Sequence, residues 1–176
     1  MWSNARPSIG LAALAAMTVF CFDVAGSETL KNHYDDPFVQ VTNAISACPP
    51  TRGPFMTVKE AQMEAHPRIE RGTTCFRAGK CIEPNSYRYD ARIAKAAQAA
   101  VTQALRETPA LSQSTVWLTM QRRFVFVQGC VARKSDVARW ERLLKAVPEV
   151  EYVGVELAVG KRAVDFKRVP YPLMPR

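Results

Sequence analysis

Cysteines are the residues of this sequence best suited to chemistry, because thiols form disulfides, bind metals and act as redox nucleophiles. The chain has five of them: Cys21, Cys48, Cys75, Cys81 and Cys130. No two form the C-x-x-C pair that is typical of zinc sites and thiol redox catalysts, and the two histidines lie far from any tight cluster. We therefore expect structural disulfides, with no metal site and no cofactor.

Catalytic patterns are equally scarce. The sequence has no Ser-His-Asp set within a supporting motif, no phosphate-binding loop and no H-E-x-x-H pair. The run His33-Tyr34-Asp35-Asp36 has cation-binding residue types, but a polar linker is the better explanation. Asp90 is better explained as a helix cap than as a catalytic carboxylate. We expect a protein that is not an enzyme.

The N-terminus indicates export. Residues 9–22 form a continuous apolar run that is shorter than the roughly 20 residues of a membrane-spanning helix. Small residues follow it, so residues 1–26 resemble a signal peptide cleaved near Gly26, with an uncleaved anchor as the alternative. Cleavage would remove Cys21 and leave four cysteines. Four cysteines in an exported, periplasmic chain predict two disulfides.

Four cysteines allow three pairings. We expect Cys75–Cys81, because the sequence between them contains a plausible Ala78-Gly79 turn, and Cys48–Cys130 as the remaining pair. In the chain-entropy description the short loop contributes about 2 kcal/mol and the long loop about 4 kcal/mol.

The elements that must position these residues fall into two parts. Residues 27–86 contain six prolines and predict an irregular extension. One short helix is expected at about 57–66, because Thr57-Val58-Lys59-Glu60 is a capping-box pattern and Pro67 follows. This extension is too small to form its own core and must pack on the rest of the chain.

Residues 87–159 are more regular and predict a small α+β domain of order α-β-β-α-β. A helix over 91–106 follows Asp90 as N-cap, and alternating strands at 115–121 and 124–131 form a hairpin. Ser135 is expected to cap a second helix, and a last strand covers 152–159. The prediction is a three-stranded sheet with two helices on one face, followed by a basic, proline-containing tail over 160–176.

This order and these residues resemble the BON domain of periplasmic osmotic-stress and envelope-maintenance proteins. The resemblance covers residues 87–159 and rests on the opening helix, the hairpin VWLTMQRRFVFVQGCV and the closing VPEVEYVGVELAV. Gly129 occupies the family's strand glycine, which predicts a bulge or a close approach by the second helix. The resemblance implies a binding module for phospholipid or envelope proteins rather than an enzyme.

The chain departs from the family pattern at three places. Glu149 stands where the family usually has glycine before the last strand. Arg122-Arg123 replaces the commoner aspartate or asparagine followed by glycine at the hairpin tip. The asparagine late in the last strand corresponds to Gly154 or Glu156, depending on the register.

Basic residues form the candidate binding surface, in keeping with a formal net charge of +8. They are Arg88, Arg92 and Lys95 on the first helix, Arg122 and Arg123 at the hairpin tip, and Arg139, Arg142 and Lys145 on the second helix. Such a surface suits an anionic phospholipid surface or an acidic envelope protein, whereas export argues against nucleic acid. A solvated charged face is the plainer explanation for any single residue.

Trp117 is the aromatic candidate. It alternates with Val116 and Leu118, so it should lie on the sheet face that the helices leave open. Either the extension, held by Cys48–Cys130, covers this face, or the face contacts a ligand or membrane. The sequence thus predicts a periplasmic binding or adaptor protein that docks on anionic phospholipid or an envelope complex. The alternative is an accessory subunit of a secretion or surface-assembly apparatus that acts through protein contacts only.

Overall fold

A computed structural model describes residues 28–84 and 87–160 of the chain, without the side chains of residues 71–73 and 75. The predicted signal peptide at 1–26 and the predicted basic tail beyond residue 160 lie outside the described residues. Within the described part, no helix is long and apolar enough to cross a membrane.

Four strands form one mixed sheet in the order β1-β2-β3-β4. They are β1 (Phe38–Asn43), β2 (Ser114–Gln121), β3 (Phe124–Val131) and β4 (Tyr152–Val159). β2 pairs antiparallel with β1 and β3, whereas β3 and β4 are parallel. The three strands predicted from the sequence are present to within one residue.

The predicted three-stranded sheet is nevertheless wrong, because the extension contributes β1. Val39 and Val41 of this strand pack against the core that the other strands share. The alternation around them spans six residues directly after Pro37, too short a signal to separate a strand from an irregular segment. Pairing with β2, a contact distant in the sequence, is what makes it a strand.

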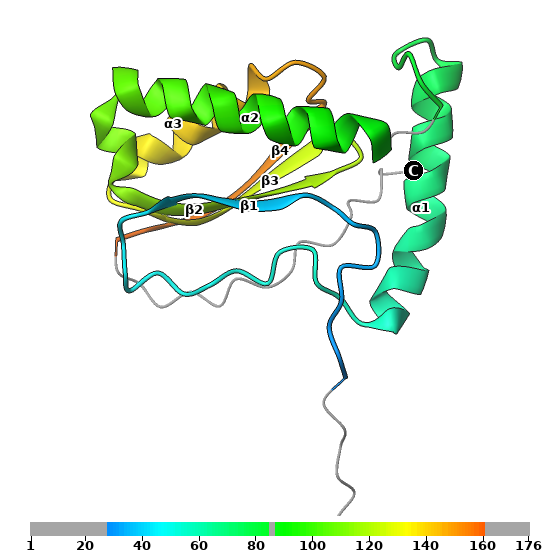
Figure 1. Ribbon diagram of the computed structural model, residues 1–176, viewed down its shortest axis with the longest axis horizontal. Coiled ribbons are helices and arrows are strands. Elements are labelled where there is room, and N and C mark those ends of the chain that lie inside the picture. The colour runs from blue at the N-terminus through cyan, green and yellow to red at the C-terminus, as the bar shows by residue number, and fades with distance from the viewer. Residues whose placement is uncertain (1–27, 85–86, 161–176) are drawn as a thin grey trace, which may run out of the picture.

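Two long helices cover one face of the sheet (Figure 1). They are α2 (Tyr87–Glu107) and α3 (Lys134–Lys145), and a 3-10 helix, η1 (Pro109–Ser112), follows α2. The α+β class and the placement of two helices on one face are as predicted. The core between the layers includes the fully buried side chains of Ile93, Leu118 and Trp140.

Both predicted helix caps are wrong. α2 begins at Tyr87, so Asp90 lies in its first turn and its carboxylate accepts hydrogen bonds from the hairpin tip instead. α3 begins at Lys134 and its N-cap, Arg133, makes no side-chain capping bond. Ser135 is therefore inside the helix. In both cases the helix begins upstream of the residue with the best capping side chain, which lies within the first turn.

The extension also contains α1 (Val58–Arg77), which stands beside one end of the sheet (Figure 1). Its predicted capping box is confirmed, since Thr57 and Glu60 exchange side-chain and backbone hydrogen bonds. The predicted end near residue 66 is wrong, because the helix continues through Pro67. An internal proline costs about 3 kcal/mol. The next residue, Arg68, is fully buried in ion pairs, so the continued helix places this contact directly after the proline.

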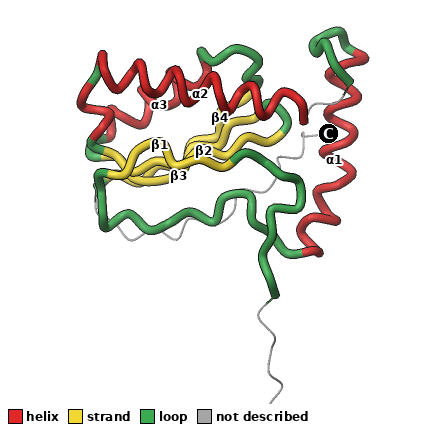
Figure 2. The backbone as a smooth tube through the Cα atoms, in the orientation of Figure 1, coloured by secondary structure: helices red, strands yellow, loops and turns green. Residues whose placement is uncertain are grey.

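The segment between β1 and α1 crosses the sheet face opposite the helices (Figure 2). The predicted disulfide Cys48–Cys130 is confirmed and joins this segment to β3, with a Cα–Cα distance of 5.8 Å. Phe55 contacts Phe38 of β1 edge-on. Cys81 is also disulfide-bonded; its predicted pairing with Cys75 stays a prediction, because that side chain lies outside the described ones.

Gly129 is required by a close approach, but by a different neighbour from the one predicted. Its φ is +139°, and a Cβ at this position would collide with the backbone oxygen of Thr115 on β2. The register between β2 and β3 runs without a shift, so there is no bulge between these two strands. The neighbouring strand, rather than the second helix, excludes a side chain here.

Candidate functional site: the outer surface of the helical layer

The hairpin tip is held by Asp90 of α2. Arg122 and Arg123 have φ values of +54° and +72°, as in a two-residue turn that usually contains asparagine and glycine. The Asp90 carboxylate accepts hydrogen bonds from both backbone N–H groups, at 2.7 and 2.8 Å. Burial raises the pKa of Asp90 to about 6, against the opposing effect of these two hydrogen bonds. This contact fixes α2 to the end of the hairpin.

Neither arginine at the tip projects outward as the sequence suggested. Arg122 is 4% exposed and its guanidinium lies over the ring of Tyr87. Arg123 donates hydrogen bonds to the backbone oxygen of Glu149 at 2.9 Å and to Sγ of Cys81 at 2.8 Å. Both side chains therefore serve internal contacts, and the tip presents little cationic surface.

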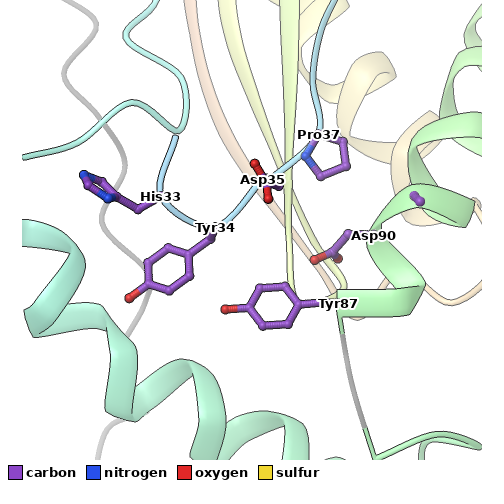
Figure 3. A pocket seen from close by; sticks show the side chains of 7 residues that line it. His33, Tyr34, Asp35, Pro37, Tyr87 and Asp90 are labelled. Atoms are coloured by element: carbon purple, nitrogen blue, oxygen red, sulfur yellow. The ribbon is translucent and has the colours of Figure 1, made fainter. Parts of the chain in front are cut away.

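A pocket of about 470 Å³ lies between the start of the extension and the start of α2 (Figure 3). Its lining consists of His33, Tyr34, Asp35, Pro37, Tyr87, Asp90 and Ala91. The rings of Tyr34 and Tyr87 stack with their centroids 6.3 Å apart. Across the described residues, no group of three or more histidine, cysteine or acidic side chains is placed to hold a metal ion.

A buried ion cluster attaches α1, and it includes Asp36, which lies between the pocket residues Asp35 and Pro37 in the sequence. Arg68 donates to both carboxylate oxygens of Asp36, at 2.9 and 2.8 Å, and also to Glu64. Its guanidinium packs over Tyr34, whose hydroxyl donates to the backbone of Ala61. Desolvation raises the pKa of Asp36 despite the arginine. Residues 33–36, expected to be a polar linker, are thus an anchoring segment.

The basic residues predicted on the first helix are mostly paired. Arg92 forms ion pairs with Glu149 at 3.1 Å and Glu83 at 3.0 Å, and Arg88 lies 3.5 Å from Glu83. Both arginines are exposed, so these pairs add little stability, but they neutralise part of the expected positive surface. Lys95 is exposed and forms no ion pair with any residue that the structure describes.

The second helix, α3, likewise carries basic residues with and without ion-pair partners among the described residues. Arg139 pairs with the buried Asp136 at 3.0 Å, and Lys145 pairs with Glu141 at 2.6 Å. Arg142 is exposed and has no ion-pair partner among the described residues. Of the eight predicted basic residues, only Lys95 and Arg142 combine exposure with the lack of such a partner within the described chain.

Two further cations share these properties and were missed. Arg106 near the end of α2 and Lys134 at the start of α3 are exposed, and neither pairs with a described residue. The sequence already indicated that all four lack an ion-pair partner on their own helix, because none has a carboxylate three or four residues away on it. Lys145 and Arg139 do have one, in Glu141 and Asp136.

These four residues, Lys95, Arg106, Lys134 and Arg142, are called the basic helical surface below. α2 begins beside the hairpin tip, whereas α3 begins where β3 ends, at the opposite end of the sheet, so the helices run antiparallel. Arg106 and Lys134 therefore lie toward one end of the layer, and Lys95 and Arg142 toward the other. Each helix carries four basic and two acidic residues, which leaves the layer net positive.

Trp117 lies on the opposite face of the sheet, as predicted, and is half-buried. It packs with Ile45 against the Cys48–Cys130 disulfide. The segment after β1 thus covers this part of the face, which fits the cover interpretation better than direct ligand contact.

Comparison of the chain with protein-family models, with curated proteins and with solved structures finds no match. Its function must therefore be argued from its own residues.

Proposed function

We propose that this protein is a non-enzymatic, exported binding or adaptor protein that docks on anionic phospholipid through its basic helical surface. The observation that carries the proposal is the set of four exposed cations on one helical layer that lack ion-pair partners among the described residues. Unpaired cations lose no existing partner when they approach a lipid phosphate. The arginines paired with Glu83, Glu149 or Asp136 would first have to give up a carboxylate.

The expected interaction is weak and reversible. Each cation held near an anionic bilayer contributes about 1 kcal/mol. Four together contribute about 4 kcal/mol at best, which corresponds to roughly millimolar affinity. Salt weakens such binding, because the groups are exposed and the Debye length is only about 8 Å at physiological ionic strength.

Three features support an exported BON-like protein. The Cys48–Cys130 disulfide suits an oxidising compartment, in keeping with the predicted signal peptide and a periplasmic location. Glu149, which stands at a family glycine, has a φ of +68°, a conformation that glycine favours. The hairpin tip has positive φ where the family places asparagine or aspartate and glycine. At two of the three departures, the backbone conformation is thus one that the family's usual residues favour, and this supports the proposed resemblance.

A second candidate function is that of an accessory subunit of a secretion or surface-assembly apparatus, acting through protein contacts only. The observation that favours it is the exposed apolar edge of α1. Val58, Ile69 and Phe76 are 54%, 64% and 43% exposed and fall on one side of the helix. An exposed apolar row along one side of a helix is a candidate edge for docking a protein partner.

Flotation of the mature protein with phosphatidylglycerol or phosphatidylcholine vesicles, at low and moderate salt, tests the lipid proposal. We expect flotation with phosphatidylglycerol only, lost in the double variant Lys95→Glu/Arg142→Glu. The matched control, Lys59→Glu/Lys80→Glu, makes the same charge change at exposed positions of the extension and should still float.

Absence of flotation by the unmodified protein under all conditions would reject lipid docking and favour the protein-only function. Equal loss in both double variants would show that net charge matters, rather than the basic helical surface.

A further inference from the structure

The two edges of the sheet are built differently. β1, at one edge, has six residues, and its register with β2 shifts between Gln40 and Thr42. The chain after it is tied to β3 by the Cys48–Cys130 disulfide. β4, at the other edge, has eight residues and pairs with β3 without any shift. No described strand pairs with its outer side.

Natural proteins protect open edges with short strands, bulges, prolines or lysines, because an unprotected edge pairs with another strand. β1 has two of these features. β4, with the sequence YVGVELAV, is long and regular, contains no proline or lysine, and carries Glu156 as its sole charge. Large apolar side chains at its two ends are exposed, Tyr152 at 48% and Val159 at 39%.

We propose that β4 pairs antiparallel with β4 of a second copy of this chain, which extends the sheet across a two-fold axis. The strand is self-complementary when the axis passes beside Val155. On the helix side of the sheet, Val153 then faces the partner's Leu157, and Val155 faces the partner's Val155. All of these positions are apolar and suit cross-strand packing.

The opposite side of the sheet favours the same register. Tyr152 faces the partner's Ala158, a large residue beside a small one, and Glu156 faces the partner's Gly154. An axis moved by one residue toward the C-terminus would place two Glu156 carboxylates opposite each other, which is destabilising. An axis moved toward the N-terminus would place two Gly154 residues opposite each other, which offers no side-chain packing. Gly154 cannot carry a side chain in any case, since a Cβ there would lie 2.7 Å from the ring of Phe126.

The two-fold axis would place both helical layers on the same side of the extended sheet. α3 lies over β3 and β4, so the α3 helices of the two copies would run next to each other at the new junction (Figure 1). One strand pair alone buries less than the roughly 1,200–2,000 Å² of a stable interface, so we expect concentration-dependent association. If the proposed lipid docking holds, the dimer presents two basic helical surfaces to one membrane.

Sedimentation equilibrium of the mature protein without lipid tests the pairing. We expect a monomer–dimer equilibrium that Val155→Lys weakens by about tenfold or more, because the two lysines would meet at the axis. The matched control is Val39→Lys on β1, another partly buried valine on the helix side of an edge strand, which should leave the equilibrium unchanged.

Hydrogen exchange of the unmodified protein keeps the proposal testable if Val155→Lys does not fold. Amides of β4 that point away from β3 should gain protection as the protein concentration rises, while the outward-facing amides of β1 should not. A monomer at every concentration, or equal effects of the two lysine variants, would overturn the proposal. Protection of the outward-facing β4 amides that does not depend on concentration would also overturn it and indicate cover from within the same chain.

Discussion

α2 and α1 are helices of nearly equal length that attach to the protein by opposite means. α2 buries apolar residues such as Ile93, Ala97 and Val101 against the sheet. Among the described side chains of α1, only Ala61, Glu64 and Arg68 are buried, and two of these are charged. α2 is therefore held by non-directional apolar packing, whereas α1 depends on a few directional contacts.

Apolar packing is spread over many residues, so the loss of one contact leaves the others in place. A buried ion cluster concentrates its contribution in a few atoms, and removal of one partner leaves the others as unpaired buried charges. We therefore expect substitutions in the core beneath α2 to lower global stability and substitutions in the buried ion cluster to release α1 alone. The predictions that follow test this division.

Trp140→Ala should have the largest effect, a loss of about 4 kcal/mol of global unfolding free energy, because it opens a large cavity in the core. Trp140 is fully buried, and its indole N–H has no hydrogen-bond partner in the described structure. Trp140→Phe keeps an aromatic ring in the core and leaves a smaller cavity, so it should cost less than Trp140→Ala. Urea unfolding of both variants provides the measurement. Equal losses would mean that the indole N–H is needed.

Arg68→Met should release α1 at a local cost of about 3 kcal/mol, because Asp36 and Glu64 lose their buried counter-charge. Hydrogen exchange should accelerate throughout α1 while the amides of β2 and β3 keep their protection. Arg52→Met is the control. Its ion pair with Glu60 is about 30% exposed and should contribute 1 kcal/mol or less. Faster exchange in β2 and β3 would show that the extension and domain unfold as one unit.

The domain was predictable because its signals are local. Periodic apolar residues define α2, α3 and three strands within windows shorter than 20 residues, and the structure matches them closely. The secondary structure of the extension was not predictable in this way, because its elements depend on partners that are distant in the sequence. β1 requires β2, and the continuation of α1 beyond Pro67 coincides with the contact between Arg68 and Asp36, which are 32 residues apart.

The candidate site was likewise predictable only where it depends on residues close in the sequence. Exposure of Lys95 and Arg142 follows from their helix positions, and local spacing would also have found Arg106 and Lys134. The inward turn of Arg122 could not be read from the hairpin, because it depends on Tyr87 and Asp90 across the fold. Charge can be counted in a sequence, but its availability depends on contacts between distant residues.

Asp90→Asn should remove a pH dependence that arises where the extension meets the domain. The pKa of Asp90 is about 6 in the folded protein against 3.8 for an ordinary aspartate, so the folded state binds the proton more tightly. This contributes stability at low pH, and up to about 3 kcal/mol is lost as the pH rises from about 4 to about 6. Urea unfolding across this range should show the fall in the unmodified protein.

The variant should show a smaller fall over the same range. Asp36, whose pKa is also raised by burial, contributes in the same direction and remains in both proteins, so the difference between the two profiles reports Asp90. Parallel profiles would mean that the Asp90 carboxylate titrates alike in the folded and unfolded chains.

Glu149→Gly should have the smallest effect, a gain of about 0.5 kcal/mol, and it separates backbone strain from surface charge. Glu149 holds a φ of +68°, which costs a residue with a side chain about 1 kcal/mol relative to glycine. Its ion pair with Arg92 is exposed and stabilises the folded protein by less than this strain costs. Arg92→Gln removes the same pair while keeping the strain, so it should be neutral or slightly destabilising in urea unfolding. Destabilisation by Glu149→Gly would instead mean that Arg92, between Glu149 of the domain and Glu83 of the extension, contributes to holding the two regions together.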